Sequence, residues 1–348
     1  MAQIDKPNLH FNTKLHSGTN STTTITGVGF QPDWTWWKSR NNAVNHAMYD
    51  AVRGGSKLLR PNQANAEENN AAVSAFTSDG VTLTGGDSFT NASGYTYVSW
   101  NWKANGAGSS NTGGSITSTV SANATSGVSI IKYTGTGSAA TVGHGLSAIP
   151  KMIIIKGLTN TSAENWRVFH HKTSAQRLIW NDADAAGNST DFGANGSGGT
   201  ITQNINYFNI GTDARVNGSG AEYIAYCFTD KKGFSKFGSY NGNGSSDGPF
   251  IYTGFKPAFV MVKRTNAGGF NWYINDNKRK TFNTNSTSLF TNTNSAETSD
   301  GMYLDMLSNG FKIRETGNAV NNSSGSHVYM AFAQNPIVGS NNIPATAE

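Results

Sequence analysis

The chain carries one sequence pattern three times, and this repetition limits its possible folds more than any other feature. In each copy a proline precedes a short apolar run that ends in a lysine six residues after the proline. The pairs are Pro32 and Lys38, Pro150 and Lys156, and Pro257 and Lys263. Because such recurrence at a long period is typical of tandem structural units, we predict three copies of one domain.

Further features recur in the same order. An asparagine followed by an aromatic residue or histidine comes after each apolar run, at Asn45-His46, Asn165-Trp166 and Asn271-Trp272. An Asn-x-Ser-Gly element begins later at Asn91, Asn217 and Asn322. A run of Tyr, an aliphatic residue, a small residue and an aromatic then follows at Tyr97–Trp100, Tyr223–Tyr226 and Tyr329–Phe332. We expect Asn-x-Ser-Gly to form tight turns rather than glycosylation acceptors, and the Asn-aromatic pairs to pack in cores rather than stack on sugars.

The local patterns indicate an all-β chain. Apolar runs of four to six residues, rich in β-branched and aromatic types and bounded by Gly or Asn, are typical of strands. The best helical candidate, Glu67–Phe76, is short. Copies of roughly 100 residues with several such strands favour three tandem antiparallel β-sandwiches of the jelly-roll or lectin type.

In the strand after each proline, the residues that point to one face and those that point to the other are both apolar. A half-exposed strand would alternate, so we expect its outer face to be covered by a loop, a neighbouring copy or another subunit. The final strand of each copy has one small face and one bulky face, which would allow a close approach on the small side. Ser99 and Asn101 form the small face of the first copy, and Ala225 with Cys227 that of the second.

These patterns predict five segments. They are repeat 1 at 1–105, a Gly/Ser/Thr-rich linker at 106–127 with one strand near Ile116–Val120, repeat 2 at 128–233, repeat 3 at 234–335, and a C-terminal arm at 336–348. The linker predicts a first repeat that moves relative to a rigid second-third pair. Three repeats could close into a pseudo-threefold unit within one chain, or stand in extended order within a homotrimer.

Composition narrows the class of protein. Eight Trp, 18 Phe and 12 Tyr argue against disorder. The net charge of +5 is spread without a basic run, so we expect no nucleic-acid binding. One cysteine permits no internal disulfide, which fits assembly in a reducing cytoplasm. The N-terminal residues have no apolar signal region, and no apolar run approaches a membrane span, so we expect no membrane insertion.

Catalytic and metal-binding patterns are sparse. No acid, base or nucleophile set recurs with the repeat, so we predict no catalytic, cofactor-binding or metal-binding residues and no enzymatic activity. Adjacent strand residues point to opposite faces, so His170 and His171 should not chelate one ion. Asp182 and Asp184 share a face but lack the other ligands of a calcium loop. We expect the recurring lysines to reach solvent or pair with carboxylates at strand ends.

Several segments resemble a repeat family of virion proteins from tailed bacteriophages, common in marine phages of cyanobacteria and other bacteria. They are Gly27–Asp33, Thr141–Gly145, Phe234–Tyr240, Asp247–Pro257, Leu307–Ile313, Tyr329–Pro336 and the tail that begins at Ile343. The resemblance covers nearly the whole chain. It implies concanavalin-like β-sandwich repeats on a tail, its fibres or the capsid exterior, and it carries over no functional residues.

Two functions follow as expectations. The first is a non-enzymatic virion protein, a capsid decoration, knob or tail-associated subunit that contacts other capsid or tail proteins and forms a homo-oligomer, with a trimer as one option. The second is a glycan-binding adhesin of the same virion that recognises a host surface glycan. An enzyme that degrades capsule or lipopolysaccharide is the third reading. Any recognition surface should lie in loops where the copies differ.

Overall fold

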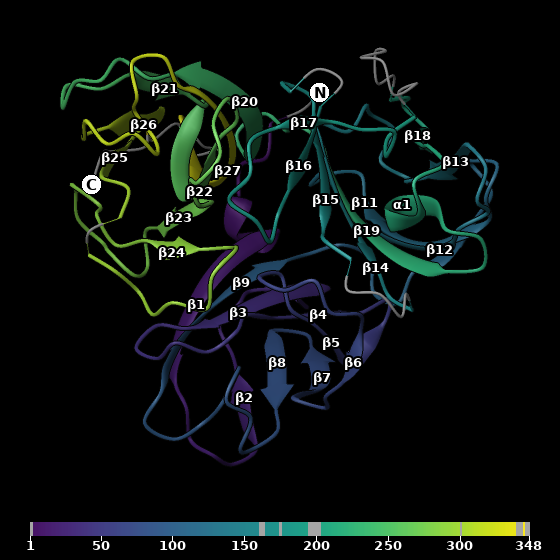
Figure 1. Ribbon diagram of the computed structural model, residues 1–348. Coiled ribbons are helices and arrows are strands. Elements are labelled where there is room, and N and C mark those ends of the chain that lie inside the picture. The colour runs from purple at the N-terminus through teal and green to yellow at the C-terminus, as the bar shows by residue number, and fades with distance from the viewer. Residues whose placement is uncertain are drawn as a thin grey trace.

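The computed structural model describes residues 3–159, 164–173, 176–193, 203–299, 301–338 and 344, which fold into antiparallel β-sheets. The strands fall into three consecutive groups, here called the first unit (residues 11–102), the middle unit (109–228) and the last unit (235–336). Figure 1 shows the first unit at the bottom, the middle unit at upper right and the last unit at upper left. The fold is therefore all-β, as the sequence predicts. Helical structure in the described residues is limited to η1 (Pro7–Leu9) and α1 (Ala214–Asn217).

The strands have the following bounds. The first unit holds β1 (Phe11–Ser17), β2 (Thr23–Ile25), β3 (Trp34–Ser39), β4 (Ala47–Asp50), β5 (Gly54–Leu59), β6 (Glu68–Asn69), β7 (Val73–Thr77), β8 (Gly80–Leu83) and β9 (Thr96–Trp102). The middle unit holds β10 (Ser109–Asn111), β11 (Ser118–Asn123), β12 (Val128–Thr134), β13 (Ala140–Gly143), β14 (Met152–Gly157), β15 (Arg167–His170), β16 (Gln176–Ile179), β17 (Gly187–Asn188), β18 (Tyr207–Ile210) and β19 (Glu222–Phe228). The last unit holds β20 (Ser235–Asn241), β21 (Phe250–Tyr252), β22 (Phe255–Arg264), β23 (Tyr273–Asp276), β24 (Leu289–Phe290), β25 (Leu304–Leu307), β26 (Gly310–Ile313) and β27 (Ser326–Pro336).

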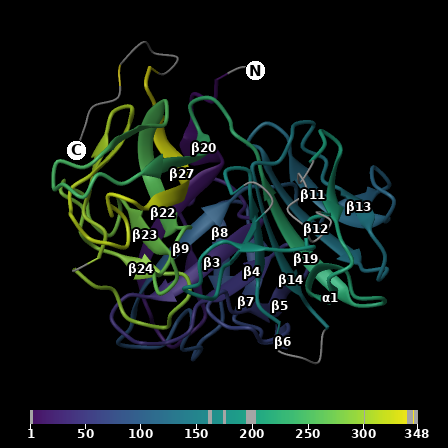
Figure 2. The ribbon, with the colours of Figure 1, turned by 45° about the horizontal axis from the view of Figure 1, so that its top comes forward.

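Each unit has a large sheet and a small sheet. The large sheets share one strand order, which reads β1-β9-β3-β4-β5, β12-β19-β14-β15-β16 and β20-β27-β22-β23-β24. The small sheets are β2-β8-β7, β13-β18 and β21-β26-β25. The order places the last strand of each unit (β9, β19 or β27) between β1, β12 or β20 and the strand of the apolar run. Figure 2 shows the same three groups after a turn of 45°.

The strand of the apolar run is buried on both faces because each face belongs to a different core. Trp37 in β3 packs with the small sheet of its own unit, whereas Trp34 and Trp36 point the other way. The same split separates Ile153 and Ile155 from Met152 and Ile154, and Val260 and Val262 from Phe259 and Met261. The cover anticipated for the second face is thus supplied by the neighbouring units.

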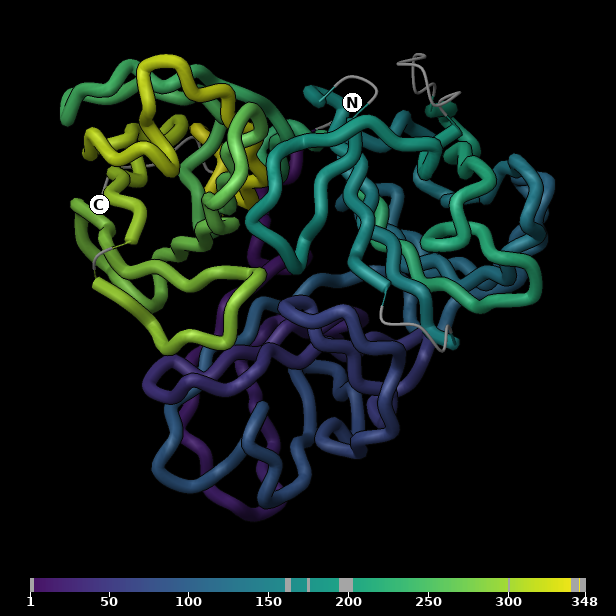
Figure 3. The backbone as a smooth tube through the Cα atoms, viewed as in Figure 1, coloured from purple at the N-terminus to yellow at the C-terminus, as the bar shows by residue number. Residues whose placement is uncertain are grey.

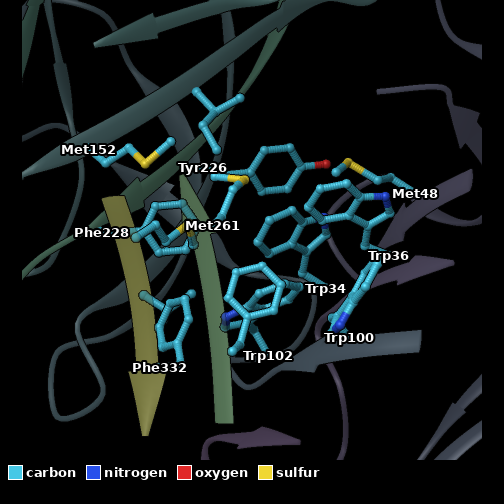
Figure 4. Close-up of a cluster of buried hydrophobic side chains, with 14 of the residues drawn as sticks. Trp34, Trp36, Met48, Trp100, Trp102, Met152, Tyr226, Phe228, Met261 and Phe332 are labelled. Carbon is cyan, nitrogen blue, oxygen red and sulfur yellow. The ribbon is translucent and has the colours of Figure 1, made fainter. Parts of the chain in front are cut away.

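That second face builds a central core to which all three units contribute. Figure 4 shows Trp34 and Trp102 beside Tyr226 and Phe228, with Phe332 of the last unit next to them. Trp34 stacks on Trp102 with ring centroids 4.1 Å apart and on Tyr226 at 4.6 Å. Because one apolar cluster spans the units, their packing together removes from water faces that would otherwise be exposed.

Two sequence expectations are wrong, and the best helical candidate is not a helix. The segment Glu67–Phe76 instead holds β6 and part of β7, with Val73 buried and Ser74 exposed. The segment 106–127 is more than a linker, since β10 and β11 extend the large sheet of the middle unit. The strand expected near Ile116–Val120 exists as β11. The first unit is also no loosely tethered part, because its tryptophans lie in the central core.

The last strand of the last unit is displaced from its predicted alignment. The recurring lysines Lys38, Lys156 and Lys263 lie opposite Val98, Ile224 and Val328. The residues that precede these partners are Tyr97, Tyr223 and His327, and His327 pairs with Tyr240. The run equivalent to Tyr97–Trp100 is therefore His327–Met330, two residues before Tyr329–Phe332. A shift of two residues keeps each side chain on its face, so the small and bulky faces are still where the sequence placed them.

The recurring turn asparagines act as side-chain clamps. Asn91 Oδ1 accepts the Thr19 N–H at 2.9 Å, and Asn217 Oδ1 accepts the Thr136 N–H at 2.8 Å. In the last unit this role belongs to Asn321, which accepts the Asn243 N–H at 2.9 Å, and not to its neighbour Asn322. A Cβ on Gly18, the residue before Thr19, would meet the carbonyl oxygen of Ala92 at 2.0 Å, so the close chain approach requires glycine there.

The C-terminal arm expected at 336–348 is largely outside the described residues. Pro336 itself ends β27, and Val338 accepts a hydrogen bond from the Gln3 side chain. Figure 3 shows the purple N-terminal part of the chain running down between the middle and last units into the first unit.

Candidate binding surfaces

The Asn-aromatic pairs form joints between units. Trp166 Nε1 of the middle unit donates to the carbonyl oxygens of Arg60 and Gln63 in the first unit, both at 3.1 Å. Trp272 Nε1 of the last unit donates to Ile179 O of the middle unit at 2.8 Å. These rings are buried, so they pack in cores and are not sugar platforms.

His46 completes the ring of joints. Its Nε2 lies 2.9 Å from Phe290 O and 3.1 Å from Thr293 O of the last unit. Its Nδ1 accepts the Trp36 Nε1–H at 2.9 Å, which places the ring proton on Nε2, facing the two carbonyl oxygens. Burial lowers the pKa of His46 well below its usual value, and the ring is therefore neutral.

The recurring lysines are buried, which contradicts the expectation that they reach solvent or pair with carboxylates. Lys156 Nζ donates to Ala64 O of the first unit at 3.0 Å and to Glu164 O at 2.8 Å. Lys263 Nζ donates to Ala183 O of the middle unit at 2.9 Å and to Phe270 O at 2.6 Å. The central core leaves a strand-end side chain no path to solvent, and loop carbonyl groups take the place of water.

Lys38 occupies the equivalent position in the first unit, and its Nζ donates to Ser39 O at 2.7 Å and Asn42 O at 3.2 Å. Burial lowers the pKa of Lys38 to about 7 and those of Lys156 and Lys263 to about 8. Lys156 and Lys263 therefore belong to joints between units, whereas Lys38 bonds only within its own unit; all three are buried.

Two joints also contain a buried ion pair. Asp50 bonds Arg53 at 2.6 Å and accepts the Tyr226 hydroxyl of the middle unit at 2.8 Å. Asp276 bonds Arg279 at 2.6 Å and accepts the Trp100 indole N–H of the first unit at 3.1 Å. Each carboxylate thus has the partners that a buried charge needs.

The third joint is uncharged. The residues equivalent to Asp50 and Tyr226 are His170 and Met330, as the strand registers show. Met330 has no donor, and His170 Nε2 instead lies 3.3 Å from Tyr329 O. A carboxylate at the position of His170 would face the apolar Met330 side chain, which has no hydrogen-bond donor for it. A neutral histidine therefore fits this joint better than aspartate.

Metal-ligating clusters are not found in the described residues: no three His, Cys, Asp or Glu side chains gather there to hold an ion. His170 ends β15 and His171 follows it, and their ring centroids lie 5.3 Å apart. Their Nε2 atoms contact Tyr329 O and Phe237 O on the paired strands β27 and β20. The charges of Asp182 and Asp184 raise the pKa of Lys263, but burial has the larger effect and lowers that pKa overall.

The exposed aromatic residues gather in the last unit. All eight tryptophans are buried, and the aromatic side chains of the described residues that are largely exposed are Phe250, Tyr252 and Phe282. Phe250 and Tyr252 alternate with buried Ile251 on β21, so both rings project from the outer face of the small sheet. We call Phe250, Tyr252, Lys312 and Asp247 the aromatic face.

Charged groups border these rings. Lys312 of β26 lies directly across from Phe250 and binds Asp247 at 2.9 Å. Arg314 lies 3.4 Å from the same carboxylate, which remains accessible. The hydrogen bond from Lys312 and its charge hold the pKa of Asp247 below its usual range. The aromatic face therefore offers flat apolar rings beside an ionised acceptor and two cationic donors.

The other units lack this combination. The pair that corresponds to Phe250 and Lys312 is Thr24 and Thr82 in the first unit. In the middle unit it is Thr141 and Asn209. Since the same sheet forms with small polar residues, the fold does not require the exposed rings. Sequence reasoning pointed to differences between copies but placed them in loops. The unbroken apolar run Phe250–Tyr252 within a turn-rich segment was the available signal.

A family model called Domain of unknown function (DUF7483) matches residues 6–336. The chain belongs to this family. The match spans all three units, so the DUF7483 domain as a whole corresponds to the joined structure and not to one repeat. A comparison with curated proteins found no match. No helix within the described ranges is long and apolar enough to cross a membrane.

Proposed function

We propose that this DUF7483 protein is a non-enzymatic structural subunit of a tailed-phage virion that acts through protein–protein contacts. The observation that carries the proposal is the central core, which fixes three units in one body. The aromatic and recurring cationic residues serve the joints, while the outer sheets vary. Such a body presents different outer surfaces at constant spacing, which suits a capsid decoration, a knob or a tail-associated subunit assembled in the host cytoplasm.

We further propose that the three units are copies of one jelly-roll or lectin-like β-sandwich domain. The shared strand order of the large sheets and their equivalent joints support a common origin. The resemblance of the Asp247–Pro257 and Tyr329–Pro336 segments to phage virion repeats supports the virion location. Partners in this proposal are capsid or tail proteins, with further copies of the chain in a homo-oligomer, for example a trimer.

The test is the polypeptide content and location of the particle. Purified virions of the phage that encodes the chain are analysed by mass spectrometry, and the chain is then located by labelling with a specific antibody in electron micrographs. Detection at many copies per particle, at capsid or tail, is the expected result. Particles that lack the polypeptide would refute the virion assignment.

Glycan binding is the second candidate, and the aromatic face is the observation that favours it. Exposed rings can stack on the apolar face of a pyranose, and the Asp247 carboxylate can accept hydrogen bonds from sugar hydroxyls. The test is a glycan array with the full chain, followed by Phe250→Ala and Tyr252→Ala. The matched controls are Thr24→Ala and Thr141→Ala at equivalent strands. Loss of binding in the first pair alone supports this candidate, and no binding to any glycan ends it.

A further inference from the structure

The first strand of the first unit has one unpaired edge. β1 pairs with β9 on one side only and ends the sheet order on the other. The bonds Lys103 N to His10 O and Gly18 N to Tyr95 O fix which residues face β9. Because hydrogen-bonded and non-bonded residues alternate in an antiparallel pair, the main-chain groups of Thr13 and Leu15 point to the free edge.

The middle unit shows what fills the equivalent edge. There β11 pairs antiparallel with β12, with Asn123 opposite Val128 and Thr119 opposite Lys132. Val128 pairs with Phe228 as Phe11 pairs with Trp102, so residues 128–132 correspond to residues 11–15. The chain therefore supplies an extra strand to the middle unit at a position that is open beside β1.

The last unit closes the same edge differently. Phe237 of β20 corresponds to Thr13, and its N–H donates to Asp230 Oδ1 at 2.9 Å. Its carbonyl oxygen lies 2.9 Å from His171 Nε2. Side chains thus satisfy both main-chain groups at this point. Neither solution is present at β1 among the described residues.

A groove lies along the open edge of β1. Two adjoining hollows of about 290 and 190 Å³ share Asn12, Thr13 and Lys278 in their walls and together follow residues 11–15. Thr13 Oγ1 and Asn277 Oδ1 belong to walls of this groove and have no hydrogen-bond partner in the described structure. Their residues are only 2% and 5% exposed. Buried polar atoms without partners are rare, so these two mark the groove wall as a place with unmet hydrogen-bonding capacity.

The charge of the groove indicates the chemistry of its occupant. Lys14 of the first unit stands at the position that Ile131 occupies in the middle unit, where Ile131 pairs with Val120 of β11. Lys14 and exposed Lys278 line the groove, and no acidic residue is among its lining residues. The Asp79 carboxylate, which interacts electrostatically with Lys14, is not one of those lining residues. Opposite charges directly across strands are stabilising, so an acidic residue suits the position that Val120 fills elsewhere.

We propose that the free edge of β1 binds an extended acidic segment of a partner protein as an additional antiparallel strand. Main-chain hydrogen bonds to Thr13 and Leu15 would hold the segment, and Lys14 and Lys278 would select its acidic side chains, as in other cases of strand addition. The inference rests on the proposed role in protein–protein contacts but not on the virion location. Virions without the polypeptide would remove the location and leave the strand-binding test intact.

The probes are fluorescein-labelled peptides with the sequence of residues 116–124, the segment that contains β11. One carries Val120→Glu and the other Val120→Lys. Fluorescence anisotropy with the full chain at low ionic strength should show at least fivefold tighter binding of the glutamate peptide. Lys14→Glu should reverse this order. Lys312→Glu, the same charge change on the distant aromatic face, should not alter it.

Hydrogen exchange locates the peptide. The glutamate peptide should slow exchange at the amides of Thr13 and Leu15, whereas Asn12 and Lys14, already bonded to β9, should not change. Thr13→Pro removes an edge donor without removing a β1–β9 hydrogen bond and should abolish binding. Lys14→Glu serves if the proline variant does not fold.

Three results would overturn the proposal. The first is the absence of binding by either peptide at millimolar concentration, and the second is binding that Lys14→Glu leaves unchanged. The third is concentration-dependent dimerisation of the chain that Thr13→Pro abolishes, because the edge would then belong to a second copy. Sedimentation equilibrium distinguishes this outcome.

Discussion

Trp272→Ala should destabilise the whole chain and not only the last unit. The Trp272 side chain is buried, stacks on Trp180 at a centroid distance of 5.9 Å, and donates to Ile179 O at 2.8 Å. Removing a buried tryptophan ring costs about 3–5 kcal/mol, and the orphaned carbonyl adds about 1 kcal/mol. The expected loss is about 4–6 kcal/mol, which is comparable with the entire stability of many domains.

Urea unfolding followed by tryptophan fluorescence and far-ultraviolet circular dichroism measures this loss. Since the central core spans the units, both signals should change together in one transition. Trp272→Phe keeps most of the ring and loses the N–H, so it should cost about 1–3 kcal/mol. Tyr252→Ala on the aromatic face should change stability by less than about 0.5 kcal/mol.

Two results would refute this reasoning. A loss below about 1.5 kcal/mol for Trp272→Ala would mean that the joint tolerates the cavity and contributes little. Separate transitions, with the first unit intact after the last has unfolded, would show that the shared core does not couple the units. Normal stability combined with loss of glycan binding would make Trp272 a ligand contact.

Three further predictions concern buried groups. Tyr226→Phe removes the hydroxyl that Asp50 accepts and should cost about 1.5–3 kcal/mol. A double-mutant cycle with Asp50→Asn measures the coupling, and additive losses would contradict a direct bond. Burial lowers the pKa of Lys156 to about 8, below about 10.4 in the unfolded chain. Between these values the unfolded chain binds more protons, so the Lys156 contribution to unfolding free energy rises with pH. Lys156→Met should reduce the rise of the urea midpoint from pH 8 to 10, and an unchanged slope would contradict it. Burial raises the pKa of the Cys227 thiol, so a thiol reagent should modify it only at the rate of unfolding, whereas rapid reaction of the native chain would contradict its burial.

The sequence showed the similarity among the predicted copies at positions where a residue determines the local backbone geometry. The glycine at Gly18 and the asparagines at Asn91 and Asn217 recur because a tight chain approach accepts few other residues. The third copy was misaligned at its final strand, since Tyr329 and His327 lie on one face and local pattern does not distinguish a shift of two residues. Only the pairing of Tyr240 with His327 resolves it.

The segment 106–127 shows the same limit. Its Gly, Ser and Thr content is typical of linkers, and β11 there owes its place to the free edge of β12. Strand formation at such a segment depends on whether the neighbouring strand β12 leaves an edge free for pairing, which composition does not reveal. The candidate surfaces were missed for a related reason. Phe250 belongs to a candidate surface because it lies across from Lys312, and Thr13 because it lines one groove with Asn277. The members of each pair meet only in the folded chain.

The sequence by itself determined the all-β class and strands apolar on both faces, because strand periodicity and turn chemistry act over a few residues. Tertiary structure decided what covers the second face. Three units close around one core, and that closure turns Lys38, Lys156 and Lys263 from expected surface groups into buried ones. The same closure makes Trp166 and Trp272 into joints and leaves the edge of β1 open. Which side chains are buried and which charges are paired depends on which surfaces meet, and segments far apart in the chain supply those surfaces.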